Sequence, residues 1–200
     1  MNRLSNALSV LLLSLVTVAP QAQEMSESSV TFGLGAGVSL PIGAFGDVAE
    51  TGFHGQAMIG FLIPNIPVSM RGDLMYHSFS GKDVSAFGTT FKGPDSRIIA
   101  GAVNGTWNLS RSDDASGSGG SNVYLIGGVG LYNFKAEGGD DEDFDESSET
   151  KFGLNVGAGF LFNLVGLDTF AEARFHNVFT SDESVRMIPI TIGVMFGGPR

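Results

Sequence analysis

Hydrophobic and polar residues alternate along eight segments of this chain, and Gly, Pro, Asp and Ser gather between the segments. A period of two is typical of β-strands, because successive side chains of a strand point to opposite faces of the sheet. The segments exceed the ~5–6 residues usual for strands of soluble proteins and approach the ~9–11 that a tilted strand needs to cross a bilayer. They are Ser29–Leu40, Gly52–Leu62, Val68–His77, Arg97–Leu109, Val123–Phe134, Lys151–Phe162, Thr169–Phe179 and Arg186–Phe196. The pattern predicts an all-β chain of eight antiparallel strands.

In most segments one phase is bulky and apolar, and the other is small or polar. The last segment, for instance, places on one face Ile188, Ile190, Ile192, Val194 and Phe196. The segment Val123–Phe134 does not reveal which of its phases faces inward. The connections 63–67 and 163–168 are short, whereas 78–96 and 135–150 are long, as expected for a barrel with turns at one end and loops at the other. Two connections depart from this pattern, because 110–122 is long and 180–185 is short.

The density of charge decides which phase faces outward. The outer face of a soluble barrel carries about 25–35 % charged residues, whereas only 16 % of this chain is charged and its mean hydropathy is +0.17. The apolar phase also has aromatic residues near the strand ends, as two interfacial girdles require: Phe53, Phe61, Tyr76, Trp107, Phe152, Phe162, Phe179 and Phe196. We therefore expect the apolar phase to face lipid and the small polar phase to line a narrow lumen.

The N-terminus has the features of a secretory signal peptide. Arg3 precedes a mostly apolar stretch, Ala7–Ala19, and Ala22 is a small residue suited to a cleavage site. The stretch is too short for a transmembrane helix, although a buried N-terminal helix remains an alternative. We expect residues 1–22 to be a cleavable signal peptide and residues 23–200 to form one barrel domain.

Two stretches resemble a known family: GLGAGVSLPIGAFGDVAETG (33–52) and EARFHNVFTSDESVRMIPITIGVMF (172–196). They are similar to the first strand with its loop and to the last hairpin of the small outer-membrane β-barrel family, the opacity-protein-like group. The resemblance implies an eight-stranded antiparallel up-and-down transmembrane barrel in the outer membrane of a Gram-negative-type bacterium. It also implies contact with outer-membrane lipid, insertion by the barrel-assembly machinery, a monomer, and termini in the periplasm. Members often end on an aromatic residue, whereas Gly197–Arg200 follow Phe196 here.

Four charged residues occupy the polar phase away from the strand ends, and buried charges require partners. They are Arg71 and Asp73 on the third segment and Glu172 and Arg174 on the seventh, which stand opposite each other in a ring of eight. We predict a lumenal ion-pair cluster whose hydrogen bonds are completed by Gln56, His54, Asn104 and Asn155, and we expect His176 to be a further hydrogen-bonding residue of the same lumenal polar cluster. The cluster would act as a structural plug or, alternatively, as the gate of a conducting lumen.

Other candidate sites are weaker. The acidic segment 135–150 contains Asp141, Asp143 and Asp145, whose spacing is a weak match to a divalent-cation site, but a solvated loop is the simpler interpretation. His77 and the two other histidines are scattered along the chain and predict no metal site. His176 has the position of the histidine in barrel enzymes that deacylate surface lipid, but Val178 stands where their serine would be.

Composition excludes several classes of protein. A net charge of −10 disfavours nucleic-acid binding, and the absence of Cys excludes disulfides and thiolate chemistry. We expect no catalytic residue and no cofactor. We expect a non-enzymatic outer-membrane protein of structural or surface-interaction type, which acts through loops 78–96 and 135–150. The alternatives are a narrow porin-like passive pore for small solutes and a secreted lipocalin-like binder of apolar ligands.

Overall fold

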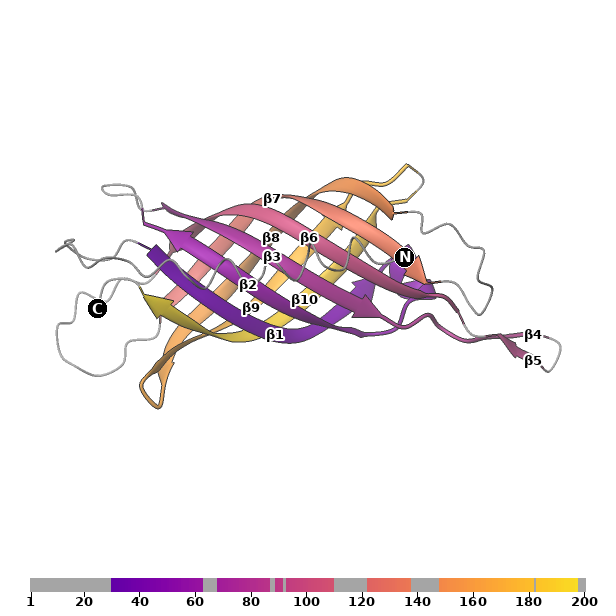
Figure 1. Ribbon diagram of the computed structural model, residues 1–200, viewed down its shortest axis with the longest axis horizontal. Helices are drawn as coiled ribbons and strands as arrows, with labels where there is room; N and C mark the ends of the chain where they lie inside the picture. Colours follow the sequence, from indigo (N-terminus) through magenta and orange to yellow (C-terminus); the bar gives the residue numbers. More distant parts are fainter. Residues whose placement is uncertain are drawn as a thin grey trace, which may run out of the picture.

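Eight long strands close into an antiparallel barrel (Figure 1). The computed structural model describes residues 30–62, 68–86, 89–91, 93–109, 122–137, 148–181 and 183–197, so the expected signal peptide lies outside the described residues. The barrel strands are β1 (Val30–Ile42), β2 (Gly52–Phe61), β3 (Val68–Phe79), β6 (Asp95–Asn108), β7 (Asn122–Glu137), β8 (Ser148–Leu164), β9 (Leu167–Val178) and β10 (Val185–Gly197). Each pairs with its neighbours in sequence, and β1 pairs with β10 to close the ring. The predicted eight-stranded up-and-down barrel is confirmed.

The strands are staggered as well as paired. Following paired residues around the ring from Phe32 on β1, through Val103 on β6, leads back to β1 at Ile42, ten positions further along the strand. This stagger tilts the strands against the barrel axis, as Figure 1 shows. An eight-stranded barrel of this kind is just wide enough inside for side chains to fill it.

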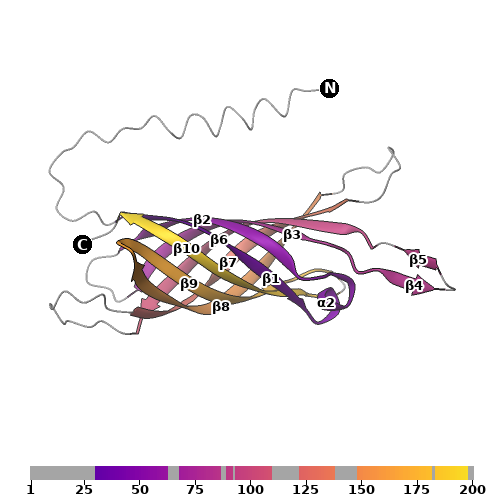
Figure 2. The ribbon, with the colours of Figure 1, turned by 90° about the horizontal axis from the view of Figure 1, so that it is seen from below.

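The two ends of the barrel differ. At one end β8 and β9 join through Val165 and Gly166, whose φ angles of 52° and 81° fit the type I′ turn of a tight hairpin. At the other end, the loop end, the strands extend further than the sequence predicted, and the hairpin of β4 (Val84–Ala86) and β5 (Thr89–Phe91) projects beyond the wall (Figure 2).

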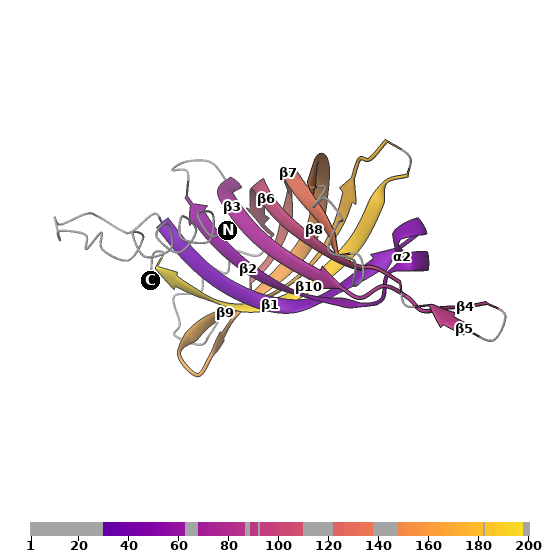
Figure 3. The ribbon, with the colours of Figure 1, turned by 45° about the vertical axis from the view of Figure 1, so that its right-hand side comes forward.

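A short helix, α2 (Ala44–Val48), also lies at the loop end (Figure 3). The connection between β3 and β6 holds it in place, because the Glu50 amide donates to the Ser80 carbonyl at 2.8 Å and the Lys82 amide to the Val48 carbonyl at 2.8 Å. Among the described residues, no helix is long and apolar enough to cross a bilayer.

The bulky apolar phase faces outward, as predicted. Leu34, Val156 and Ile192 are 59 %, 60 % and 58 % exposed. A lipocalin-like binder would need this phase to line its interior, so the arrangement argues against that alternative.

Aromatic residues form the two expected girdles. On β8, Phe152 stacks on Phe179 at 6.1 Å near the loop end, and Phe160 stacks on Phe162 at 5.6 Å near the opposite end. Phe152 and Phe162 are ten residues apart. With a rise of ~3.3 Å per residue and the tilt of a barrel strand, this separation spans about 25 Å, the height of a lipid-facing band.

Candidate functional site: the lumen of the barrel

Four charged side chains meet in the middle of the lumen. Arg71 and Asp73 come from β3, and Glu172 and Arg174 come from β9 on the opposite wall; all four are at most 6 % exposed. Arg71 Nη2 lies 2.8 Å from Glu172 Oε1, and its Nε lies 3.1 Å from the Asp73 carboxylate. Arg174 donates to both acids, from Nε to Glu172 Oε1 at 2.5 Å and from Nη1 to Asp73 Oδ2 at 3.3 Å.

Neutral side chains supply further hydrogen bonds to the two carboxylates. Gln56 Nε2 donates to Asp73 Oδ1 at 3.1 Å, and Asn104 Nδ2 donates to Asp73 Oδ2 at 2.5 Å. The Tyr124 hydroxyl donates to Glu172 Oε2 at 2.6 Å. We call these seven residues the ion-pair layer: Gln56, Arg71, Asp73, Asn104, Tyr124, Glu172 and Arg174. Its two positive and two negative charges cancel, which reduces the electrostatic penalty of burying them.

The structure departs from the predicted cluster at Asn155 and His54, and it adds Tyr124. Asn155 is buried, yet neither amide atom of its side chain has a hydrogen-bond partner among the described residues, so its expected part in the network is wrong. His54 lies in the lumen but contacts Ser39 and Thr191 rather than the ion pairs. His176 is buried in the lumen and hydrogen-bonds with Tyr132. Tyr124 was missed, because the sequence of β7 did not show which phase faces inward.

The three histidines form a second layer, nearer the loop end. Ser39 Oγ lies 3.0 Å from His54 Nδ1 and 2.8 Å from His77 Nδ1. The Tyr132 hydroxyl lies 2.8 Å from His176 Nδ1. The His77 ring is 5.3 Å from that of His54 and 6.4 Å from that of His176. Residues that are scattered in the sequence are therefore neighbours in the lumen.

The histidine layer does not amount to a metal site. In the part of the chain that the structure describes, no group of three His, Asp or Glu residues has the geometry to hold a metal ion. The weak candidates Asp141, Asp143 and Asp145 lie outside the described residues.

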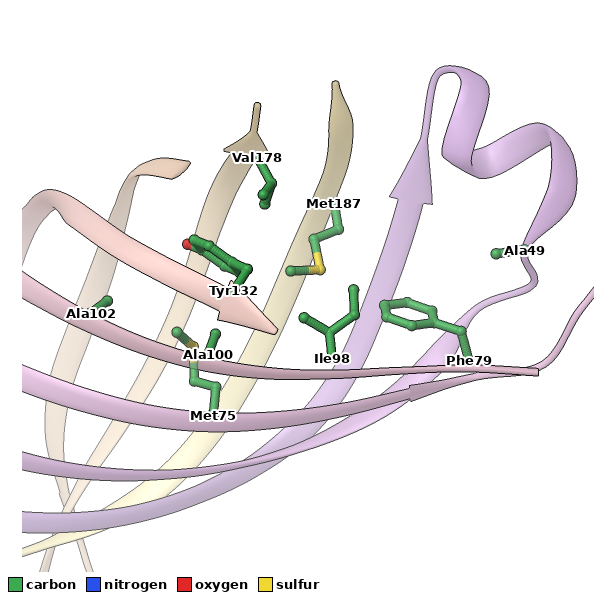
Figure 4. Packing of buried hydrophobic residues seen from close by; sticks show 9 residues of the cluster. All are labelled: Ala49, Met75, Phe79, Ile98, Ala100, Ala102, Tyr132, Val178 and Met187. Atoms are coloured by element: carbon green, nitrogen blue, oxygen red, sulfur yellow. The ribbon is translucent and has the colours of Figure 1, made fainter. Parts of the chain in front are cut away.

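An apolar layer fills the lumen at the loop end (Figure 4). The buried residues shown there are Ala49, Met75, Phe79, Ile98, Ala100, Ala102, Tyr132, Val178 and Met187. The helix α2 adds Phe45, whose ring meets that of Phe79 edge-to-face at 5.0 Å. The expectation of a lumen lined only by small and polar residues is therefore wrong. Apolar residues are found there because the interior of the barrel must be closely packed, and no charged side chains fill this part of the lumen.

Glycine makes room for the large lumenal rings. Tyr124 lies against Gly159 and Tyr132 against Gly153, and a Cβ atom at either glycine would overlap the ring. The many glycines of the inward phase are thus a steric requirement of this filled lumen.

Together, these features define a class of protein. A closed barrel with an apolar outer wall, two aromatic girdles and a neutralised lumen is a small outer-membrane β-barrel. The family model described as the outer membrane protein beta-barrel domain matches residues 8–196, so the chain belongs to that family. Its location is the outer membrane of a Gram-negative bacterium, in contact with membrane lipid.

Solved structures share the fold at low sequence identity. Neisserial surface protein A (NspA) is 15 % identical with a TM-score of 0.61, covering 86 % of this chain and 99 % of that one. A major outer membrane protein from Thermus thermophilus is 13 % identical with a TM-score of 0.56, covering 84 % and 98 %. The outer membrane protein OprG from Pseudomonas aeruginosa is 10 % identical with a TM-score of 0.53, covering 86 % and 99 %. No curated protein matches the sequence significantly.

Proposed function

We propose that this chain is a closed, non-enzymatic barrel with a structural or surface-interaction role in the outer membrane, and that its lumen does not conduct. The observation that carries the proposal is the stacking of two unlike layers across the lumen. The ion-pair layer crosses it from β3 to β9, and the apolar layer lies above it under α2. A solute would have to displace both.

The energetics of the ion-pair layer support a plug rather than a gate. Each arginine contacts both acids, so moving one side chain would leave several buried charges without partners. Breaking a buried pair in this way costs about 3–5 kcal/mol. A gate that opens readily would need a smaller penalty.

The buried state of its nucleophile candidates argues against catalysis. Ser39 has two histidine neighbours, an arrangement that could activate a hydroxyl, but its side chain and those of His77 and His176 are 0 % exposed. Val178, two residues after His176, is also 0 % exposed. A substrate would have to enter a filled lumen to reach them.

Planar-bilayer recordings of the folded full-length protein test the proposal. We expect no discrete conductance from the wild type. We also expect silence from Arg174→Ala, because the apolar layer of Phe79, Ile98 and Met187 remains in place. Only preparations that keep the mobility of a folded barrel on unheated gels would be recorded, so that an unfolded variant is not scored as silent.

Regular single-channel openings of the wild type would overturn the proposal and favour the porin-like alternative. Openings that appear in Arg174→Ala but not in Arg186→Ala would instead identify the ion-pair layer as a gate. Arg186 is the matched control, because it is exposed and contacts Asn177 at 3.1 Å rather than the lumenal acids.

A further inference from the structure

All the histidines of the chain lie in one buried layer of the lumen. The sequence contains three, and His54, His77 and His176 are each at most 5 % exposed. They come from different strands, β2, β3 and β9, and the ring of His77 is within 6.4 Å of both others. Histidine is the side chain whose ordinary titration falls between about pH 5 and 8. Every such group of the chain is therefore concentrated at one level of the barrel.

The hydrogen bonds of this layer suit neutral imidazole rings. Ser39 has one hydroxyl proton, so it donates to Nδ1 of one of its two neighbours, His54 and His77, and accepts from the other. Tyr132 has a hydroxyl proton to donate to His176 Nδ1. His77 Nε2 and His176 Nε2 have no hydrogen-bond partner among the described residues. A protonated ring needs an acceptor at both nitrogens, so protonation of either residue would leave a buried N–H group unpaired.

Within the described barrel, the histidines face no unpaired carboxylate. The buried carboxylates are those of Asp73 and Glu172, and Arg71 and Arg174 already bind both. Arg174 is two positions before His176 on the same face of β9, so it adds positive charge beside the layer. The neighbours from β1, β7, β8 and β10 are neutral: Ser39, Tyr132, Asn155 and Thr191. A proton on the layer would therefore meet like charge without compensation.

A stack of aromatic rings connects the histidine layer to the helix α2. The His77 ring is stacked on that of Phe79, with centroids 6.2 Å apart and an angle of 10° between the planes. Phe79 in turn meets Phe45 of α2 edge-to-face. Because Phe79 is only 2 % exposed, α2 and this ring cover His77 from the loop end. Displacement of α2 together with Phe79 would expose His77 to water.

We propose that α2 and Phe79 form an acid-released lid over the histidine layer, closed while the histidines are neutral and opened when they bind protons. A histidine in water titrates near pH ~6.5. Below that pH an uncovered histidine binds a proton, whereas the closed layer offers a bound proton no partner. Protons therefore shift the equilibrium toward the open lid. The proposal goes beyond the structural role, and it does not depend on whether the lumen conducts.

Amide hydrogen exchange of the full-length protein in lipid nanodiscs tests the lid. NMR compares about pH 7.5 with about pH 5.5, after correction for the intrinsic pH dependence of exchange. The reporters are the Glu50 and Lys82 amides, whose hydrogen bonds hold α2 in place. Their protection should fall about tenfold in acid if opening exposes His77 alone, and about a thousandfold if it exposes all three histidines. The control is the Leu109 amide, which donates to the Val123 carbonyl at the opposite end and should keep its protection.

His77→Asn separates proton binding from packing. Asparagine keeps a polar group near the position of Nδ1, within reach of Ser39, but binds no proton, so the loss of protection in acid should shrink about tenfold. Tyr132→Phe is the matched control, because it removes the hydrogen bond to His176 and no titrating ring. It should change protection by the same factor at both pH values.

Equal corrected protection of the wild-type Glu50 and Lys82 amides at the two pH values would overturn the proposal. An acid response of undiminished size in His77→Asn would also overturn it. A parallel loss of protection at Leu109 would overturn it in favour of acid unfolding of the whole barrel.

Discussion

The charged residues of the lumen each need partners of opposite charge or hydrogen-bond donors, because they are buried. Glu172 illustrates this, since it accepts hydrogen bonds from Arg71, Arg174 and Tyr124 while its side chain is fully buried. The four charged members of the layer could be found from the sequence, because charge is rare in the interior of the predicted strands. The sequence could not reveal the part of Tyr124, nor that Asn155 has no hydrogen-bond partner among the described residues, because each depends on which side chains face it across the lumen.

Glu172→Gln should destabilise the barrel by about 3–5 kcal/mol, because it leaves two buried guanidinium groups facing a single carboxylate. Urea unfolding of the protein reconstituted in lipid vesicles measures this. The control is Lys151→Gln, which removes an ion pair with Glu149, a residue whose side chain is 68 % exposed. Such surface pairs contribute about 0–1 kcal/mol. Similar losses in the free energy of unfolding for both variants would contradict a large contribution of the ion-pair layer to stability.

Each strand has two alternating sets of side chains, one that faces lipid and one that faces the lumen. The last segment, β10, has only apolar residues in its outward phase between Ile188 and Phe196, and its inward phase contains Thr191 and Gly193. This alternation is strong enough to set the register from sequence, because a slip by one residue would exchange the two faces. In β7 both phases are apolar, so only the packing of its tyrosines against glycines decides the orientation.

Ile192→Arg tests the orientation of β10. Ile192 is 58 % exposed on the lipid face, and an arginine near the bilayer midplane costs about 2–4 kcal/mol. Val165→Arg, at a turn residue that is 95 % exposed beyond the strand ends, should cost close to nothing. The same vesicle-based unfolding assay compares them, and a wild-type-like stability of Ile192→Arg would contradict a lipid-facing Ile192.

The whole molecule is defined by closure. Pairing of β1 with β10 leaves no open edge in the ring, and in hydrocarbon every backbone polar group must be paired in this way. Closure also creates the layered lumen, a feature that no single strand contains.

Heat-modifiability measures closure directly. We expect the unheated detergent-solubilised protein to migrate differently from the boiled protein on SDS gels, because the closed barrel resists unfolding by detergent. Gly37→Leu should abolish the folded band, since a Cβ there would overlap the backbone of Ile190 across the β1–β10 pair. Gly55→Leu, which meets no neighbour, should keep it. A wild type with one mobility under both conditions would contradict a closed barrel.

The class of fold, the number of strands and the lipid-facing phase could be predicted from the sequence, because they depend on local alternation and on the scarcity of charge. The sequence also identified Arg71, Asp73, Glu172 and Arg174 as inward-facing. The division of the lumen into polar and apolar layers, and the meeting of the three histidines, appear only in the folded barrel. These features arise between strands far apart in the chain, and the stagger that brings them together is a property of the closed ring.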